Sequence, residues 1–261
     1  MLLASIDGTI TPVSEATIPV TDEGLIRGDG VFEVVRLHDG VPYALDEHLE
    51  RMERSADTSL LPFDAAATRA DLEALLAAAE ATPDGVRLMQ TRGGRRIAIL
   101  EELPSYPPSI ALASVTYAPT RVLDGVKTLS YGANMLCSRL AREQGADEAL
   151  LVTPHGRVLE APTSSIFYVA GGRLCTPPLT DHILDSITRR KVLAVAEVDE
   201  RPTTLDEIKA ADEAFLASTA RDALAVHAID DVRLGDAPGP VTRDVAAKVA
   251  ALVARELAAA R

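Results

Sequence analysis

Residues 126–166 constrain the fold and chemistry of this 261-residue chain more than any other stretch. Lys127 opens the stretch among apolar and small residues, and Glu160 closes it. Between them the pattern predicts a helix that ends at Gly145, followed by two strands. The stretch therefore places one candidate nucleophile and one candidate carboxylate on a short succession of regular elements.

Lys127 is a candidate for carbonyl chemistry. Burial among apolar neighbours favours the neutral amine over the ammonium ion, and a neutral lysine attacks carbonyl groups. The product is a Schiff base, formed with a carbonyl substrate or with pyridoxal phosphate. The alternative interpretation is structural, because a lysine with apolar neighbours often extends its amine to water. Lys127 alone does not decide between the two.

The composition limits the classes of function. Hydrophobic residues make up 47% of the chain, which is enough for a core in one large domain or two smaller ones. The formal net charge of −13 argues against a nucleic acid or an anionic membrane as partner. The densest basic cluster, residues 92–96, is too short to change this interpretation.

The sequence predicts neither a membrane anchor nor a metal site. The apolar start meets Asp7 and Gly8 without a preceding basic segment, and no apolar run approaches the roughly 18 residues that span a bilayer. We therefore expect a cytoplasmic protein. Cys137 and Cys175 are too few and too far apart for a disulfide framework or a metal centre, so both are expected to be buried apolar residues.

Several segments carry signals of regular structure. Asp39-Gly40 predicts a hairpin between strands 31–37 and 41–45. In its first strand, Phe32, Val34 and Arg36 share one face, and the other face carries Val31, Glu33, Val35 and Leu37. Helices are predicted over 46–58, 65–81 and 187–197.

Five sequence blocks together resemble the class IV aminotransferases, the pyridoxal-phosphate enzymes of fold type IV. The first is the stretch that contains Lys127 and Glu160. The other four follow the order of that family and cover nearly the whole chain: Arg27-Gly28-Asp29-Gly30-Val31-Phe32-Glu33 with Arg36, His48-Leu49-Glu50-Arg51, Ile183-Leu184-Asp185-Ser186-Ile187-Thr188-Arg189, and Ala211-Asp212-Glu213-Ala214 before Ser218-Thr219. Ordered blocks over so much sequence are far more specific than any one of them.

The resemblance implies a mixed α/β (α+β) fold of two domains. A smaller N-terminal α/β domain is expected over residues 1–118, and an interdomain linker over 119–124. A larger C-terminal domain with a β-barrel-like core is expected over 125–261, and it would bind the cofactor. The family also implies a homodimer with active sites near the subunit interface.

The resemblance also implies the cofactor, pyridoxal 5'-phosphate, and the residues that hold it. Lys127 would form the Schiff base and serve as the catalytic proton carrier. Glu160 would lie beside the pyridine nitrogen, where its charge favours the protonated ring. Tyr131 would lie near the phenolic oxygen of the cofactor.

Four further residues are implied as a binding site for the cofactor phosphate. Arg51 offers a fork of donors that suits phosphate oxygens. The backbone amides of Ile187 and Thr188, at a helix N-terminus, and the hydroxyl of Thr219 would complete the site. Three phosphate-binding blocks in family order make a purely structural role for these residues a poor alternative.

Four residues are candidates for substrate binding. Phe32 and Arg36 resemble residues that face the substrate pocket. Arg95 or Arg96 would bind the substrate carboxylate, as an arginine of a comparable loop does in the D-amino acid subgroup, although either can equally be a solvated turn residue. Substitutions at positions where the family commonly has other residues put the pocket shape in doubt rather than the reaction: Ala161, Ser165, Ser186 and Ala225.

The function predicted first is transfer of an amino group between an amino acid, D-configured or branched-chain, and a 2-oxo acid. The alternative is 4-amino-4-deoxychorismate lyase, which releases pyruvate in folate synthesis. Lys127-Thr128-Leu129-Ser130-Tyr131 occurs in both groups and cannot separate them. A silent scaffold that keeps the fold is the third hypothesis, and retention of Lys127, Glu160 and Arg51 argues against it.

Overall fold

The computed structural model of the chain describes residues 1–81 and 83–259. Contacts within the chain divide it into two compact units. Unit 1 consists of Met1–Pro104 and Val126–Tyr131, and unit 2 of Ser105–Gly125 and Gly132–Arg261. The segment that carries Lys127 therefore belongs to unit 1, although most of the chain around it in sequence belongs to unit 2.

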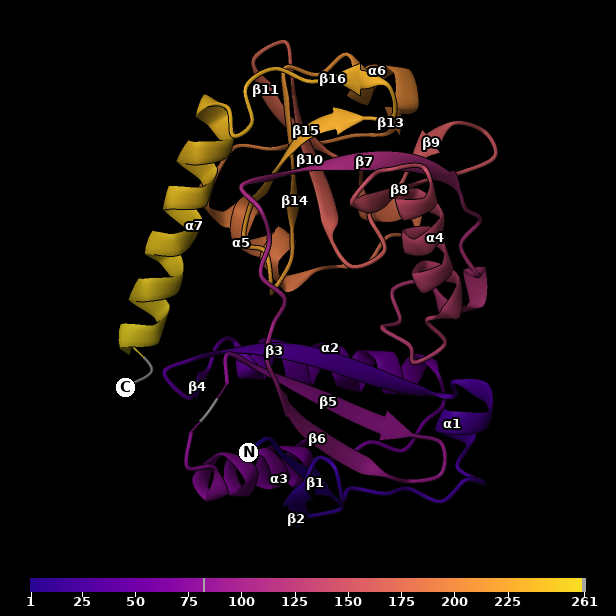
Figure 1. The fold of residues 1–261 in the computed structure, drawn as a ribbon, viewed down its shortest axis with the longest axis vertical. Coiled ribbons are helices and arrows are strands. Elements are labelled where there is room, and N and C mark those ends of the chain that lie inside the picture. Colours follow the sequence, from indigo (N-terminus) through magenta and orange to yellow (C-terminus); the bar gives the residue numbers. More distant parts are fainter. Residues whose placement is uncertain (82, 260–261) are drawn as a thin grey trace. The chain divides into compact units, whose positions relative to one another are not determined.

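Unit 1 is a six-stranded sheet with helices, and its strand order is β2-β1-β6-β5-β3-β4 (Figure 1). Its elements are β1 (Leu3–Ile6), β2 (Thr9–Pro12), α1 (Glu23–Arg27), β3 (Gly30–His38), β4 (Val41–Pro42), α2 (Leu45–Thr58), α3 (Ala65–Ala78), β5 (Gly85–Thr91) and β6 (Arg96–Glu101). The predicted hairpin is present, but its second strand covers only Val41–Pro42 instead of 41–45, and the helix predicted over 46–58 runs from Leu45 to Thr58. The helix predicted to end at 81 ends at Ala78.

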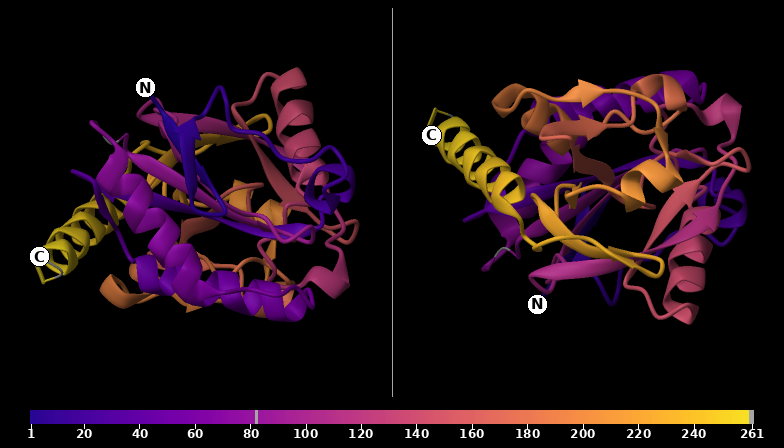
Figure 2. Two further views of the ribbon diagram at one scale, coloured as in Figure 1. Left: turned by 90° about the horizontal axis from the view of Figure 1, so that it is seen from below. Right: turned by 90° about the horizontal axis from the view of Figure 1, so that it is seen from above.

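Strand β3 shows the predicted alternation of faces. Val31, Val35 and Leu37 belong to a buried cluster that includes the inward residues of α2 and α3. Figure 2 shows both helices on the same side of the strands of unit 1. Glu33 lies on this helix-facing side, and the alternation places Phe32 on the opposite face.

Unit 2 contains a curled sheet with the order β12-β11-β10-β14-β15-β7-β8-β9-β13, to which β16 is added beside β15 (Figure 1). Its strands are β7 (Ser109–Thr116), β8 (Glu148–Val152), β9 (Arg157–Val158), β10 (Ser165–Ala170), β11 (Arg173–Thr176), β12 (Asp199–Glu200), β13 (Thr203–Thr204), β14 (Glu213–Ala217), β15 (Leu224–Ile229) and β16 (Val232–Arg233). Its helices are α4 (Gly132–Glu143), α5 (Ile187–Val195), α6 (Leu205–Lys209) and α7 (Pro240–Ala259), with single 3-10 turns at Arg121–Leu123 and Leu179–Asp181.

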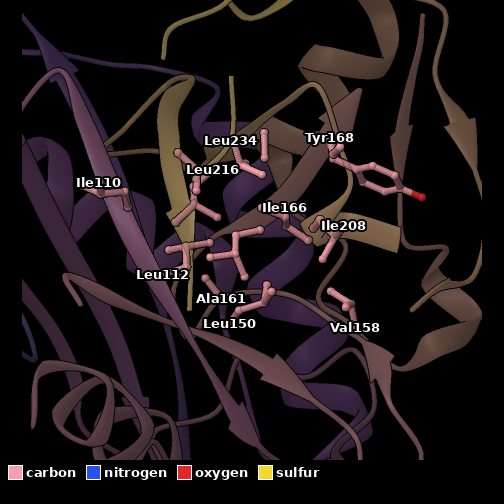
Figure 3. Packing of buried hydrophobic residues seen from close by; sticks show 14 of the residues in the cluster. Ile110, Leu112, Leu150, Val158, Ala161, Ile166, Tyr168, Ile208, Leu216 and Leu234 are labelled. Carbon is pink, nitrogen blue, oxygen red and sulfur yellow. The ribbon is translucent and has the colours of Figure 1, made fainter. Parts of the chain in front are cut away.

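The main core of unit 2 lies inside this curled sheet. Figure 3 shows Leu112, Leu150, Ile166 and Leu216 among its residues, with Ala161 close by. A second cluster joins β10 and β14 to α5 and α7 through Phe167 and other apolar residues. The curled sheet agrees with the barrel-like core expected for the larger domain, so the predicted fold class is confirmed.

The division into units differs from the predicted domain boundaries at 118 and 124. Strand β7 was expected in the N-terminal domain, but it pairs in parallel with β8 and β15 and so belongs to the sheet of unit 2. Residues 126–131, expected in the C-terminal domain, lie with unit 1. The reason is that parallel pairing joins strands far apart in sequence, which a change of composition at Pro119 does not reveal. Within 1–81 and 83–259, the structure has no helix long and apolar enough to cross a membrane.

Candidate active site

The backbone around Lys127 is fixed against the start of β3. The Lys127 carbonyl accepts a hydrogen bond from the Phe32 amide at 3.0 Å, and the Leu129 amide donates to the Gly30 carbonyl at 2.8 Å. The Lys127 amide itself donates to Ser55 Oγ, on α2, at 3.2 Å. The segment thus lies along β3 like a short added strand, and its attachment determines where the lysine side chain begins.

Two glycines of the Arg27-Gly28-Asp29-Gly30 block leave room for this segment. A Cβ on Gly28, whose φ is +68°, would lie 3.0 Å from Ser130 Cα. A Cβ on Gly30 would lie 2.6 Å from Leu129 Cδ1 and 2.5 Å from the carbonyl oxygen of Gln90. The absence of a side chain at both glycines therefore lets residues 129–130 pack closely against the start of β3. This contact joins the block of Gly28 and Gly30 to the block that carries Lys127.

Two aromatic rings lie beside the Lys127 amine. Its Nζ is 4.3 Å from the ring centre of Phe32 and 5.9 Å from that of Tyr131. The two rings meet edge to face with centres 5.4 Å apart. Three residues that the resemblance assigned to catalysis, cofactor binding and substrate binding are thus neighbours in unit 1.

The chain has four lysines, and the other three are in ion pairs with carboxylates. Lys191 pairs with Glu256, Lys209 with Asp230, and Lys248 with Asp244 one helical turn away. Lys127 is the lysine whose amine lies over aromatic rings. The Lys127 amine is thus in contact with an aromatic surface.

Behind Phe32, on the helix-facing side of β3, Glu33 holds a buried charged cluster. Its two oxygens accept Arg51 Nε at 2.7 Å and Nη2 at 2.6 Å, and Oε2 lies 2.7 Å from His48 Nδ1. Burial by itself raises the pKa of Glu33, but the ion pair and hydrogen bonds with Arg51 and His48 outweigh it and lower the pKa to about 2. Burial lowers the pKa of His48, and this effect is larger than the increase that the neighbouring Glu33 causes.

This cluster places Arg51 as a buried residue of α2 whose charge is balanced by Glu33. A buried arginine fork held by a carboxylate has a fixed orientation, which is what a ligand of a phosphate requires. Glu33 and His48 both lie in the quoted sequence blocks, yet sequence reasoning gave them no role. The signal was available, because a charged residue on the apolar face of β3 needs a partner on the helix that covers it.

The four substrate candidates have different surroundings. Phe32 is buried beside Lys127, and Arg36 lies further along the same face of β3 and is half-buried. Arg95 is paired with Asp7, and Arg96 with Asp71. Both arginines are thus already bound to a carboxylate of this chain, and the predicted clamp stays a prediction.

Sequence reasoning also missed Arg87, on β5. Its guanidinium carbon lies 5.5 Å from the ring centre of Phe32, and its nitrogens donate to both oxygens of Glu101 at 3.0 Å and 2.9 Å. The register pairs Arg87 with Val34 of β3, so it shares a face with Phe32. That alternation could have identified Arg87, but only if the pairing of β3 with β5 had been known.

In unit 2, Glu160 is fixed at the end of a short antiparallel segment. Its carbonyl accepts from the Leu151 amide at 2.9 Å, and its Oε1 accepts from the Leu184 amide at 3.1 Å. The next residue, Ala161, is buried in the core shown in Figure 3. The hydrogen bond from Leu184 thus connects the Glu160 carboxylate to the segment that leads into α5.

That segment ends at a capped helix N-terminus. Ser186, which stands where the family commonly has glycine, is the N-cap of α5, and its side chain accepts from the Arg189 amide at 3.3 Å. The first amides of a helix have no partner within the helix, so those of Ile187 and Thr188 point beyond its start. The substitution therefore keeps the helix start that the phosphate prediction requires.

Thr219 lies in a turn directly after β14. The amides of Arg221 and Asp222 both donate to the Ser218 carbonyl at 3.0 Å and close this turn. The end of β14 pairs with the start of β10, through Ala217 and Ser165, only a few residues after Glu160. Within unit 2, a hydrogen bond joins Glu160 to the segment before α5, and the pairing of β10 with β14 places the Thr219 turn next to the strand that follows Glu160.

These groups have the chemistry that pyridoxal phosphate requires. A helix N-terminus and a hydroxyl suit a phosphate dianion. A carboxylate suits a protonated pyridine nitrogen, and an amine suits an aldehyde. The residues present therefore fit the cofactor.

Comparisons with known proteins agree with this chemistry. Residues 30–229 match the family described as Amino-transferase class IV. A D-alanine aminotransferase of Bacillus licheniformis is 30% identical over 263 residues, covering 92% of this chain and 93% of that protein. A putative branched-chain-amino-acid aminotransferase of Methanocaldococcus jannaschii is 33% identical over 253 residues, covering 86% and 87%.

Solved structures are similar over nearly the whole chain. A fold IV transaminase from Curtobacterium pusillum is 27% identical with a TM-score of 0.85, covering 95% of this chain and 99% of that one. The PLP-bound form of a hypothetical aminotransferase from Mycobacterium tuberculosis is 25% identical with a TM-score of 0.86, covering 97% and 99%. These matches confirm the predicted family and cofactor, and they favour aminotransferase over lyase. The chain belongs to the class IV aminotransferases and is a pyridoxal-phosphate-dependent transaminase.

Proposed function

We propose that Lys127 is the residue through which this transaminase binds its cofactor covalently and moves protons. The supporting observation is the position of its amine over the rings of Phe32 and Tyr131. Bound pyridoxal phosphate supplies an electron sink that stabilises negative charge at the substrate α-carbon. With the cofactor bound, Lys127 Nζ would accept the proton that leaves this carbon.

Glu160 and the phosphate residues complete this proposal. Glu160 holds a proton on the pyridine nitrogen through its negative charge. The amides of Ile187 and Thr188, the hydroxyl of Thr219 and the guanidinium of Arg51 bind the phosphate. Tyr131 contacts the phenolic side of the ring.

Amino acids and 2-oxo acids are the substrates of an aminotransferase, and we propose that D-amino acids are accepted at least as well as L-amino acids. The support is the similarity to the D-alanine aminotransferase of Bacillus licheniformis. The second candidate is the L-branched-chain class, supported by the similarity to the Methanocaldococcus jannaschii relative. Phe32 and Arg36 would contact the substrate, and Arg95 or Arg96 would bind its carboxylate.

A substrate panel separates the two classes. The protein is incubated with pyridoxal phosphate, 2-oxoglutarate and matched D- and L-amino acids, and glutamate formation is measured. Faster transfer from D-alanine than from L-leucine, L-isoleucine and L-valine is expected. Exclusive use of the three L-amino acids would assign the protein to the branched-chain class instead.

The test of Lys127 is chemical. Borohydride reduction of the cofactor-loaded protein, followed by peptide mapping, should label Lys127. The Lys127→Ala variant should lose turnover by on the order of 10²–10⁴-fold or more, because the proton carrier is removed, and its circular dichroism should stay that of a folded protein. Lys209→Ala is the matched control and should keep both label and turnover. A label on Lys191, Lys209 or Lys248 in the wild-type protein would contradict the assignment.

We also propose a cytoplasmic homodimer, a state that the family resemblance supports. Light scattering at working concentration should give twice the chain mass of 27.7 kDa. A stable and active monomer would contradict this part of the proposal.

A further inference from the structure

Arg221 belongs to the turn that carries Thr219, and its side chain points into unit 2 rather than to water. The turn is closed by the amides of Arg221 and Asp222 on the Ser218 carbonyl. The Arg221 side chain is only 6% exposed. A buried guanidinium is costly unless its charge and its donors are matched.

The partners of Arg221 come from three separate segments. Nη2 donates to Glu148 Oε2 on β8 at 2.7 Å, and Nη1 donates to Ser164 Oγ at 2.8 Å. The guanidinium carbon lies 4.6 Å from the ring centre of Tyr106. Glu148 also accepts from Ser138 Oγ at 2.7 Å, so the carboxylate is held from both sides.

Ser164 connects this network to Glu160. The Ser164 and Ala161 backbones form an isolated bridge that closes the tight turn after Glu160. The Arg221 side chain therefore links the Thr219 turn to the turn that follows the carboxylate. Both segments are proposed to hold the same cofactor, one by its phosphate and the other by its ring.

Stability alone is a poor reason for this arrangement. Replacing a buried ion pair by apolar side chains of similar volume is often neutral or stabilising. Arg221 Nε is moreover buried without a hydrogen-bond partner in the described part of the chain, which adds to the cost. An apolar residue could fill the space, but it could not fix the distance between two turns through directed bonds.

We propose that Arg221 is a positioning residue of the cofactor site: it fixes the Thr219 turn relative to Glu160, with Glu148 as its buried counter-charge. This inference rests on the proposed roles of Thr219 and Glu160. Loss of Arg221 frees the phosphate side more than the ring side, because Glu160 keeps its hydrogen bond from the Leu184 amide.

The experiment compares the binding of two probes to the cofactor-free protein. Dissociation constants of pyridoxal phosphate and of pyridoxal, which has no phosphate, are measured by absorbance titration. The variants are Arg221→Met, Glu148→Gln and the double variant Arg221→Met/Glu148→Gln. Thermal midpoints are measured on the same samples, and Lys209→Met serves as a control that removes another ion pair of unit 2.

In Arg221→Met, pyridoxal phosphate should bind roughly tenfold or more weakly, because the Thr219 turn is no longer held in position. The affinity for pyridoxal should fall by a smaller factor. The thermal midpoint should fall, because Glu148 is left buried and unpaired. The double variant removes that charge, together with any repulsion of the phosphate by Glu148. It should therefore recover the midpoint while the affinity for pyridoxal phosphate stays low.

Two results would overturn the inference. One is recovery of both the midpoint and the affinity in the double variant, which is the behaviour of a purely structural residue. The other is an equal loss of affinity for pyridoxal phosphate and pyridoxal in Arg221→Met. A wild-type protein that does not bind pyridoxal phosphate would instead contradict the proposed cofactor residues themselves, and the positioning role with them.

Discussion

Each unit of the molecule contains a buried arginine–carboxylate pair, and the two pairs are built differently. Glu33–Arg51 in unit 1 and Glu148–Arg221 in unit 2 are about equally buried. The first joins β3 to α2, two packed elements with only the short β4 between them, across 18 residues of sequence. The second joins a turn to β8 across 73 residues, and to the Ser164 turn across 57.

The difference shows that similar burial can serve different purposes. The first pair neutralises charge inside a helix–sheet contact and includes a titratable neighbour, His48. The second connects turns that regular backbone pairing leaves apart, and its carboxylate is shared with a serine hydroxyl. Loss of the first pair should therefore lower the stability of unit 1 and also release Arg51, a proposed phosphate ligand. Loss of the second pair should mainly change the relative positions of two turns of unit 2.

The largest expected effect comes from breaking the first pair. Glu33→Ala leaves Arg51 buried without its counter-charge and should lower the free energy of unfolding of unit 1 by about 3–5 kcal/mol. Amide hydrogen exchange would measure this as lost protection in α2 and β3, with protection in β8 and β10 retained. A loss below about 1 kcal/mol would show that Arg51 finds other compensation.

A pH dependence confined to unit 1 is the second expectation. The pKa of His48 is lowered from 6.5 in the fold, chiefly by burial, so the unfolded chain binds a proton at a pH where the folded chain does not. Stability is therefore full above about pH 6.5 and falls as the pH decreases below it, by up to about 1.4 kcal/mol per pH unit. Urea unfolding across this range should show the decline, and His48→Gln should flatten it. An unchanged slope in His48→Gln would assign the dependence to another group.

The smallest effect compares one serine from each unit. Ser55 Oγ accepts from the neutral Lys127 amide, and Ser164 Oγ accepts from the charged Arg221. Hydrogen bonds to charged groups contribute more, so Ser164→Ala should cost about 1 kcal/mol more than Ser55→Ala. Thermal unfolding of the two variants measures the difference, and Arg27→Ala, which removes an exposed pair, sets the baseline. Equal costs for the two serines would mean that Ser164 contributes little to holding Arg221.

Short-range patterns in the sequence predicted much of the fold. The alternation along β3 and the helix over 46–58 depend on residues next to one another, so their apolar periodicity was sufficient. The domain boundary predicted at 118 separates β7 from the strands with which it pairs, β8 and β15. Strand pairing leaves no local signal in the sequence, so this pairing was not predicted. For the same reason, residues 126–131 were not expected beside β3.

The candidate site shows the same division. Lys127, Glu160 and the start of α5 were found from motifs, because the chemistry of each is carried by neighbouring residues in the chain. Their spatial neighbours were not predicted: Phe32, named only as a substrate candidate, lies beside the Lys127 amine, and the Leu184 amide donates to the Glu160 carboxylate. The partners of Arg95 and Arg96 likewise lie 88 and 25 residues away.

By itself, the sequence determined the family, the cofactor and the residue types that the cofactor's chemistry requires, because ordered local blocks of the sequence contain them. Only the tertiary structure decided which buried charges have an oppositely charged partner, and which residue that partner is. Arg221 has no motif of its own, and its role becomes visible when the fold brings Glu148, Ser164 and Tyr106 around it. The physical reason is that burial makes a charge depend on its neighbours in space, and those neighbours are chosen by packing rather than by order along the chain.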